Sequence, residues 1–288
     1  MTQPLSKYNN LTQRLITGIL GSAGIIAGVS YSEWIYFGIF FIICLFSLRE
    51  FYKLSGLDGM IPLKVLGTII GLVVFSLSFF IEQETISHRY YFLIFPLVAI
   101  VYLVKLYKKT EHKPFTNIAF TFLGIIYIAL PLALLNHAAF RIHDDASIAG
   151  VIGHNVYNFE IILGCLLILW ASDTGAYFAG TFFGKHKLFE RISPKKSWEG
   201  FWGGAGLAIV ITYILTLYFH SLSLVDWMIV SLIIIIGGTF GDLVESLLKR
   251  SIEIKDSGTS LPGHGGFLDR FDGLFISAPF IVAYLEIF

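Results

Sequence analysis

The chain has 288 residues, of which 56% are hydrophobic and only 14% are charged. Soluble domains contain roughly 45–50% apolar and about 25% charged residues, so a water-soluble fold of this length could not bury so much apolar surface. Lys and Arg total 20, as do Asp and Glu, so net charge says nothing about partners; a nucleic-acid partner is not expected. Cys44 and Cys165 lie inside apolar runs without metal-site or disulfide spacing, which argues against a zinc site or a disulfide framework.

Apolar runs long enough to cross a bilayer recur along the whole chain. A membrane-spanning helix needs about 20 mostly apolar residues, and only helices or closed barrels satisfy their backbone polar groups in lipid. The sequence therefore predicts an all-α, polytopic integral membrane protein with about nine transmembrane helices. Their expected positions are 15–31, 33–48, 62–81, 90–106, 117–136, 159–181, 201–219, 225–245 and 267–287.

The even spread of these runs favours a single membrane domain over 1–288. Its N-terminal helices, 1–150, are expected to be mainly scaffold, and the helices and loops of 151–288 to carry the active site. Gly21, Gly24 and Gly28 form a small-residue face that lets helices approach closely in lipid. This face is compatible with a homodimer and equally with packing inside one subunit.

The basic residues predict the orientation of the chain. Cytoplasmic loops of membrane proteins are enriched in Lys and Arg. If the N-terminus is cytosolic, alternate connections place every Lys and Arg on the cytosolic side except Arg89 and Arg141. We therefore expect a cytosolic N-terminus and an odd number of spans. Two cysteines and no recognisable organelle signal favour a bacterial inner membrane with the polar loops in the cytosol.

Polar residues gather in the segment 241–272, around the end of the eighth predicted span. Asp242, Glu245 and Lys249 share one helix face by their spacing, and Asp242 lies about 10 Å deeper in the membrane than Lys249. Ionisable groups at such depth are candidates for function by default. The alternative is that they only pair with neighbouring arginines as interfacial charges.

A turn follows this face, because Pro262 and the neighbouring glycines break the helix. The ninth span then begins with Asp269 near the point where the eighth ends, so Asp242 and Asp269 are expected to converge. Mg²⁺ is commonly held by one or two carboxylates plus substrate phosphates. Lys and Arg beside them neutralise phosphate oxygens as charge shifts during phosphoryl transfer.

A second polar stretch covers 170–204. Asp173 lies near the cytosolic end of the sixth span, and the loop 193–200 combines adjacent lysines, hydroxyl donors and a proline. Glu199 is placed to cap the following helix. Such a loop suits a triphosphate, although an ordinary positive-inside loop also explains Lys195 and Lys196.

Other nucleotide and hydrolase motifs are absent. The segment from Gly180 to His186 is one residue short of a Walker A motif and lacks its final Ser or Thr. No G-x-S-x-G elbow is present, and the scattered histidines lack metal-ligand spacing.

The segment 246–272 reads Ser246-x-Leu248-Lys249-Arg250, then Lys255-Asp256-x-Gly258, then Leu261-Pro262-x-His264-Gly265-Gly266-Phe267-x-Asp269-Arg270-Phe271-Asp272. This pattern resembles that of the phosphatidate cytidylyltransferase (CDP-diacylglycerol synthase) family. Asp173 to Gly184 and the loop 193–200 are also similar to it, whereas the first 150 residues match only by hydropathy. Thr181 and Ser197 depart from the pattern, where relatives commonly have a basic residue and Thr.

The resemblance implies a membrane-helix fold and a reaction between CTP and phosphatidate that gives CDP-diacylglycerol and pyrophosphate. It implies Mg²⁺ and allows a second, monovalent ion such as K⁺. The catalytic residues would be Asp242, Asp269, Lys249 and His264, with Asp242 and Asp269 as metal ligands. The residues assigned to substrate binding are Asp173, Ser193, Lys195, Lys196, Ser197, Glu199, Arg250, Lys255, Asp256, Gly265, Gly266, Arg270 and Asp272.

Two other functions fit parts of the sequence. A secondary transporter would use Asp242 and Asp269 as ion-coupling residues, but it predicts midplane charges and a repeat between halves, and neither is present. A CTP-dependent lipid kinase would transfer the γ-phosphoryl group and release CDP instead of pyrophosphate.

Overall fold

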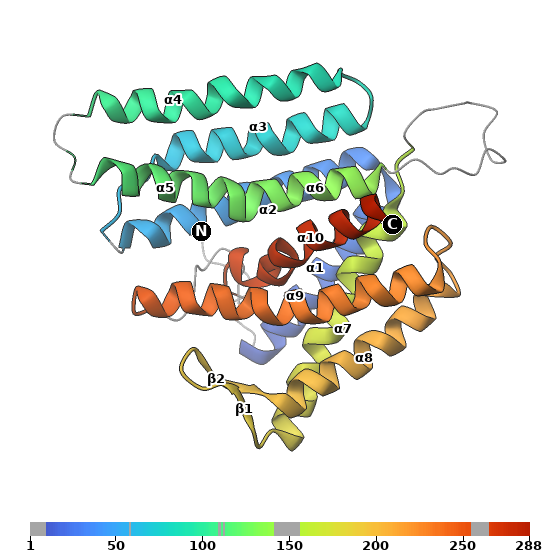
Figure 1. Ribbon diagram of the computed structural model, residues 1–288. Coiled ribbons are helices and arrows are strands. Elements are labelled where there is room, and N and C mark those ends of the chain that lie inside the picture. The colour runs from blue at the N-terminus through green and yellow to red at the C-terminus, as the bar shows by residue number, and fades with distance from the viewer. Residues whose placement is uncertain (1–9, 58, 109–110, 112, 141–155, 255–264) are drawn as a thin grey trace, which may run out of the picture.

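The computed structural model describes residues 10–57, 59–108, 111, 113–140, 156–254 and 265–288. Helices dominate these residues (Figure 1). In chain order the elements are α1 (Asn10–Tyr31), α2 (Glu33–Leu57), α3 (Lys64–Glu82), the 3₁₀ helix η1 (His88–Leu93), α4 (Ile94–Leu106), α5 (Pro114–Gly124), the π-helix η2 (Ile125–Ala129), α6 (Leu130–Ala139), α7 (Phe159–Phe183), β1 (Lys187–Phe189), β2 (Ser193–Ser197), α8 (Trp198–Thr216), α9 (Leu224–Ser251) and α10 (Leu268–Ile287).

Each of the nine predicted spans falls on a helical segment. Seven segments within the described residues are long and apolar enough to cross a membrane, so the polytopic membrane fold is confirmed while the count of nine is not. The described apolar part of α1 is shorter, covering Gly18–Tyr31. Helix α10 is not among the seven, and it carries Asp269, Arg270 and Asp272 within its first five residues.

Local sequence explains where several helices begin. The side chain of Ser223 accepts from the backbone of Asp226, and the Asp226 carboxylate accepts in return, so α9 starts with a complete capping box. Pro114 occupies the first turn of α5, where its missing N–H costs nothing. Ser197 caps α8 by accepting from Gly200 N–H at 3.1 Å. The cap of this helix is therefore Ser197, and the expectation that Glu199 caps it was wrong.

The helices form two neighbouring groups. Helices α2, α3, α4 and the continuous α5–η2–α6 segment lie side by side, while α7, α8 and α9 form the second group (Figure 1). Helix α10 packs against both α6 and α9 and so joins the groups. The antiparallel β1–β2 hairpin precedes α8 and contacts α7 and α8. The sequence predicted a loop over 193–200, where the structure has strand β2 and the start of α8.

Small residues bring α9 and α10 into close contact. A Cβ atom added at Gly241 would lie 2.5 Å from the Asp272 carbonyl oxygen, and one added at Gly273 would lie 3.0 Å from Gly238 Cα. Helices in membranes use such small residues because they allow backbones to approach. This close approach of the two backbones places Asp242 of α9, the residue after Gly241, beside Asp272 of α10.

Helices α2 and α3 pack antiparallel, again through glycines. A Cβ atom at Gly67 would lie 2.4 Å from the Tyr52 hydroxyl oxygen, and one at Gly71 would lie 2.6 Å from Leu48 Cδ1. The buried Tyr52 hydroxyl donates to the Thr121 carbonyl oxygen at 2.6 Å, which ties α2 to α5.

Candidate active site

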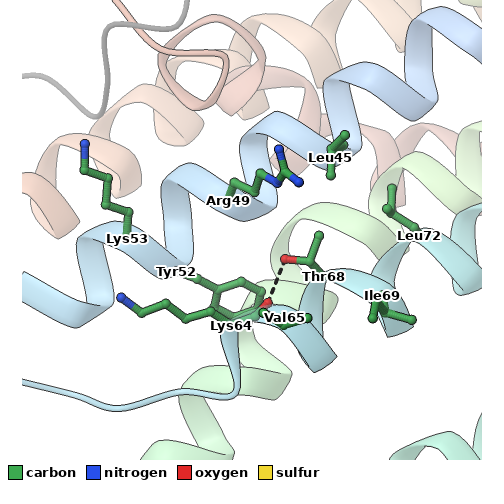
Figure 2. Close-up of a pocket in the computed structure, with 9 residues that line it drawn as sticks. All are labelled: Leu45, Arg49, Tyr52, Lys53, Lys64, Val65, Thr68, Ile69 and Leu72. Carbon is green, nitrogen blue, oxygen red and sulfur yellow. Dashed lines mark hydrogen bonds between the residues drawn. The ribbon is translucent and has the colours of Figure 1, made fainter.

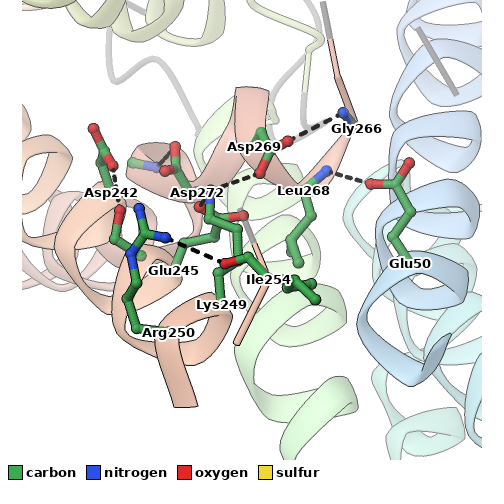
Figure 3. A network of polar contacts seen from close by, with 12 residues as sticks. Glu50, Asp242, Glu245, Lys249, Arg250, Ile254, Gly266, Leu268, Asp269 and Asp272 are labelled. Carbon is green, nitrogen blue, oxygen red and sulfur yellow. Dashed lines mark hydrogen bonds and ion pairs between the residues drawn. The ribbon is translucent and has the colours of Figure 1, made fainter. Parts of the chain in front are cut away.

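Three carboxylates meet between α9 and α10. One carboxylate oxygen from each of Asp242, Glu245 and Asp272 lies within 4.8 Å of the others. Asp242 and Glu245 share a face of α9 through their i, i+3 spacing, and Asp272 faces them from the first turns of α10 (Figure 3). Glu245 is buried, and one of its oxygens, Oε1, has no hydrogen-bond partner within the described residues. We call Asp242, Glu245 and Asp272 the acidic cluster.

Lys196 connects the β-hairpin to the acidic cluster. Its Nζ lies 2.8 Å from Asp242 Oδ2 and donates to the Thr239 carbonyl oxygen at 3.2 Å. The other Asp242 oxygen accepts from the Ser246 hydroxyl at 3.1 Å. Because the Asp242 side chain is 47% exposed, this part of the cluster remains open to a ligand.

Lys249 lies at the other side of the cluster, one turn beyond Glu245. Its Nζ forms ion pairs with the Glu245 carboxylate and, at 2.9 Å, with Asp269 Oδ1. The second Asp269 oxygen accepts from Gly266 N–H at 3.2 Å. Asp269 is therefore held by Lys249 and by the turn before α10, and it is not one of the three converging carboxylates. The prediction that Asp242 and Asp269 bind a metal as a pair stays a prediction, since the structure brings a different set together.

The turn before α10 needs glycine. Gly265 has φ +83°, in the left-handed region that residues with a side chain rarely adopt. An added Cβ there would also lie 2.9 Å from Asp269 Oδ2. On the other side of this turn, Glu50 of α2 accepts from Leu268 N–H at 2.9 Å (Figure 3). A carboxylate at a helix N-terminus is favourable because the first amide groups lack partners inside the helix.

Further predicted residues surround this region. Asp173 of α7 interacts electrostatically with Asp242, Lys196 and Arg270, and it is exposed. The acidic cluster, Asp173 and Asp269 together contribute more carboxylates than the neighbouring cations can balance. Those cations are Lys196, Lys249 and Arg270. Carboxylates crowded together repel one another as anions, and this repulsion is relieved either by protonation or by an added cation.

The hairpin residues differ in what they contact. Lys195 is exposed, whereas Ser197 is buried as the cap of α8. Glu199 accepts from the backbone N–H groups of Lys185 and His186 at 3.1 and 3.2 Å, so it holds the turn that leads from α7 into the hairpin.

The remaining predicted residues are less connected to the cluster. Ser193 begins β2 opposite Phe189. The exposed Arg250 points toward the Ile254 carbonyl oxygen at 3.5 Å. The predictions for Lys255, Asp256 and His264 lie outside the described residues.

Three residues near the site were not assigned to it from the sequence. Glu245 was visible as part of the α9 face, but the resemblance assigned it no role. Glu50 and Tyr127 come from the half expected to be scaffold. The Tyr127 hydroxyl is buried without a hydrogen-bond partner in the described structure, and it interacts electrostatically with Asp272, Glu245 and Asp242. No pattern in the sequence links positions 50 and 127 to α9.

The acidic cluster fits a divalent metal. Mg²⁺ prefers oxygen ligands and keeps several waters or substrate oxygens in its coordination shell. Such an ion agrees with three carboxylates within reach of one point, with a Glu245 oxygen that no described residue hydrogen-bonds, and with the local excess of acidic groups over basic ones.

Comparisons with known proteins place this chain in a family. The profile of the cytidylyltransferase family matches residues 12–288. The chain is 33% identical over 287 residues to a phosphatidate cytidylyltransferase of Bacillus subtilis (strain 168), covering 97% of this chain and 99% of that protein. It is 46% identical over 122 residues to a phosphatidate cytidylyltransferase of Staphylococcus haemolyticus (strain JCSC1435), covering 42% of this chain and 46% of that one. For the protein of the same name from Staphylococcus aureus (strain COL), identity is 47% over 122 residues with the same coverage. The resemblance seen in segment 246–272 is thus confirmed, and the chain belongs to the cytidylyltransferase family.

Proposed function

We propose that this chain transfers the cytidylyl group of CTP to phosphatidate, forming CDP-diacylglycerol and pyrophosphate for phospholipid biosynthesis. The observation that carries the proposal is the meeting of Asp242, Glu245 and Asp272 beside Lys196 and Lys249. These residues fall within the two polar stretches of the sequence, and Lys249 and Asp272 lie inside the segment 246–272 that resembles the family.

The reaction is a displacement at phosphorus. A phosphate oxygen of phosphatidate attacks the α-phosphorus of CTP, a new P–O bond forms, and the bond between the α-phosphorus and the bridging oxygen breaks. Pyrophosphate leaves with the electron pair of that bond. A phosphate monoester is already anionic near neutral pH, since its second pKa is about 6, so the nucleophile needs little help from a general base.

The chief demand on the protein is therefore to reduce repulsion between two polyanions. Lys196 is half-buried beside Asp242 and can turn its ammonium group toward phosphate oxygens without leaving the site. Lys249 is held between two carboxylates, which fixes its charge at the centre of the α9–α10 contact. Fixed charges of this kind stabilise developing charge without reorganisation during the reaction.

We also propose that the reaction depends on Mg²⁺. Asp242, Glu245 and Asp272 would hold the ion, which would screen the phosphate charges and polarise the α-phosphate. A second, monovalent ion such as K⁺ remains part of the proposal from the family resemblance. Asp269, paired with Lys249, would then orient that lysine or take part in holding the second ion.

The proposed setting is a bacterial inner membrane with the active site facing the cytosol, where CTP is available. The distribution of Lys and Arg supports this orientation. Homodimerisation also stays a proposal. Gly21 and Gly24 meet no described atom within 4 Å of an added Cβ, whereas Gly28 packs against Ile35 and Ile39 of α2.

One assay tests the reaction and separates it from its rivals. Purified protein in detergent is supplied with phosphatidate and CTP carrying a label on the α-phosphate, with Mg²⁺ or with excess EDTA. The proposal expects label in a lipid product, release of pyrophosphate and loss of both with EDTA. Release of CDP with an unlabelled lipid product would identify a lipid kinase, and the absence of any CTP turnover would favour a transporter.

A further inference from the structure

A groove runs between α2 and α3, lined by residues outside the acidic cluster and its ion pairs. It has a volume of about 450 Å³ (Figure 2). Leu45, Arg49, Tyr52 and Lys53 line it from α2 at helical spacing, and Lys64, Val65, Thr68, Ile69 and Leu72 line it from α3. Both helices are candidate membrane spans.

Three cations line the groove: Lys53 and Lys64 lie toward the end where α2 ends and α3 begins, and Arg49 lies one turn further along, level with the second turn of α3 (Figure 2). Arg49 and Lys53 lie one turn apart near the end of α2, and Lys64 is the first residue of α3. All three are exposed, and no carboxylate of the described residues pairs with any of them. A Cβ atom at Gly56 would lie 2.5 Å from Lys64 Nζ, so the Lys64 side chain lies against the end of α2.

The rest of the groove is apolar and extends along the spans. Leu72 is eight residues beyond Lys64, a distance of about 12 Å along the helix, and Ile69 and Val65 lie between them with 51% and 75% of their surfaces exposed. Leu45 lies one turn before Arg49 on the facing helix. The groove thus combines a cationic end with an apolar wall that leads into the membrane.

We propose that this groove binds an anionic phospholipid of the surrounding bilayer. The phosphate group would lie at the end lined by Lys53 and Lys64, with Arg49 one turn further along α2, and one acyl chain would lie along Val65, Ile69 and Leu72. Basic pockets between membrane helices on the cytoplasmic side favour anionic headgroups in this way. We place the cations of the groove on the cytosolic side of the membrane because Arg49, Lys53 and Lys64 are among the basic residues that the predicted orientation puts there.

The apolar wall distinguishes a lipid from a soluble anion. Inorganic phosphate would use the three cations and leave Ile69 and Val65 uncovered, whereas an acyl chain would cover both. Burial of apolar surface adds to the electrostatic attraction. A lipid therefore satisfies both parts of the groove.

The test measures lipid binding to the intact protein without turnover. Dioleoyl phosphatidylglycerol and dioleoyl phosphatidylcholine are titrated separately into detergent-purified protein, and bound lipid is counted by native mass spectrometry. We expect preferential binding of phosphatidylglycerol. Replacing the three cations together (Arg49→Gln, Lys53→Gln and Lys64→Gln) should lower its affinity about 100-fold, since each basic residue near an anionic lipid contributes to attraction.

A matched control removes three exposed cations elsewhere, with Arg89→Gln, Lys108→Gln and Lys113→Gln in one protein. This variant should keep wild-type affinity and elution in size-exclusion chromatography. Equal binding by the groove variant and the wild type, or equal binding of the neutral and anionic lipids, would overturn the proposal.

A second variant keeps every charge and fills the apolar wall. Ile69→Trp places a larger side chain on an exposed position of the groove, so it tests the acyl chain separately from the headgroup. We expect at least tenfold weaker binding of phosphatidylglycerol. Unchanged affinity, or displacement of the lipid by inorganic phosphate at equal concentration, would rule out a lipid site. Because no CTP is present, failure here leaves the proposed reaction untouched.

Discussion

Lys196 of strand β2 lies 2.8 Å from the carboxylate of Asp242 on α9. The two residues are separated by a full membrane helix, α8, and by the loop that follows it. Their contact joins the basic loop expected to bind a nucleotide to the acidic cluster expected to bind a metal. These two predicted functions therefore belong to one site.

Removal of this lysine should affect catalysis more than folding. In Lys196→Gln the charge next to Asp242 is lost, and we expect kcat/KM for CTP to fall roughly 100-fold, the typical effect of removing one electrostatic contact to a transition state. Lys187→Gln, an exposed change on strand β1 of the same hairpin, is the control and should keep activity. Equal losses in both variants would indicate a general effect of hairpin charge.

Glu245→Gln should weaken metal binding. The substitution keeps the volume of a buried side chain but removes one of three converging carboxylates. We expect the Mg²⁺ concentration for half-maximal activity to rise about 10–100-fold, the range seen when groups that support a metal site are removed. Calorimetric titration of Mg²⁺ without substrates checks this directly, and Glu190→Gln on the exposed hairpin turn is the control.

Asp269→Asn should abolish cytidylyl transfer while leaving the fold intact. The change removes a charged partner of Lys249 but no core volume, and the amide oxygen can still accept from Gly266 N–H. CTP-dependent formation of CDP-diacylglycerol in detergent is the measurement, with size-exclusion elution as the folding check. Substantial activity in a well-folded variant would remove Asp269 from the site.

Gly241→Ala should separate α9 from α10. The added methyl group would lie 2.5 Å from a backbone oxygen of Asp272, which cannot move as a side chain could. Overpacking of this kind costs about 1–3 kcal/mol, so the thermal midpoint in detergent should fall together with activity. At Gly206 of α8 an added Cβ meets no described atom within 4 Å, and Gly206→Ala should be neutral or slightly stabilising.

Tyr127→Phe should raise stability and lower activity. The Tyr127 hydroxyl is buried and has no hydrogen-bond partner among the described residues. Such a group costs about 1–3 kcal/mol, so its removal should increase the thermal midpoint. A hydroxyl kept next to the acidic cluster despite this cost is expected to serve the reaction. A stability gain with unchanged kcat would show that the hydroxyl is only tolerated.

The sequence was most informative where residues with different roles lie close together along the chain. Asp242, Glu245 and Lys249 could be placed on one helix face because helical periodicity relates them directly. The convergence of α10 with α9 also followed, since only the segment 252–267 separates the two helices in the sequence. Glu50 was not predicted, because its contact with Leu268 crosses 218 positions of the chain and no periodicity links such distant residues.

By itself the sequence determined the membrane environment, the helical segments and the two stretches in which polar residues gather, since apolar run length and rare polar residues are local properties. Only the tertiary structure decided which carboxylates meet. The close approach of Gly241 to the backbone at Asp272 sets the rotation of α9 against α10, and that rotation turns Asp272 toward Asp242 and Glu245 while Lys249 holds Asp269. Such rotations are fixed by the packing of one helix against another, so they cannot be predicted from the order of residues along a single helix.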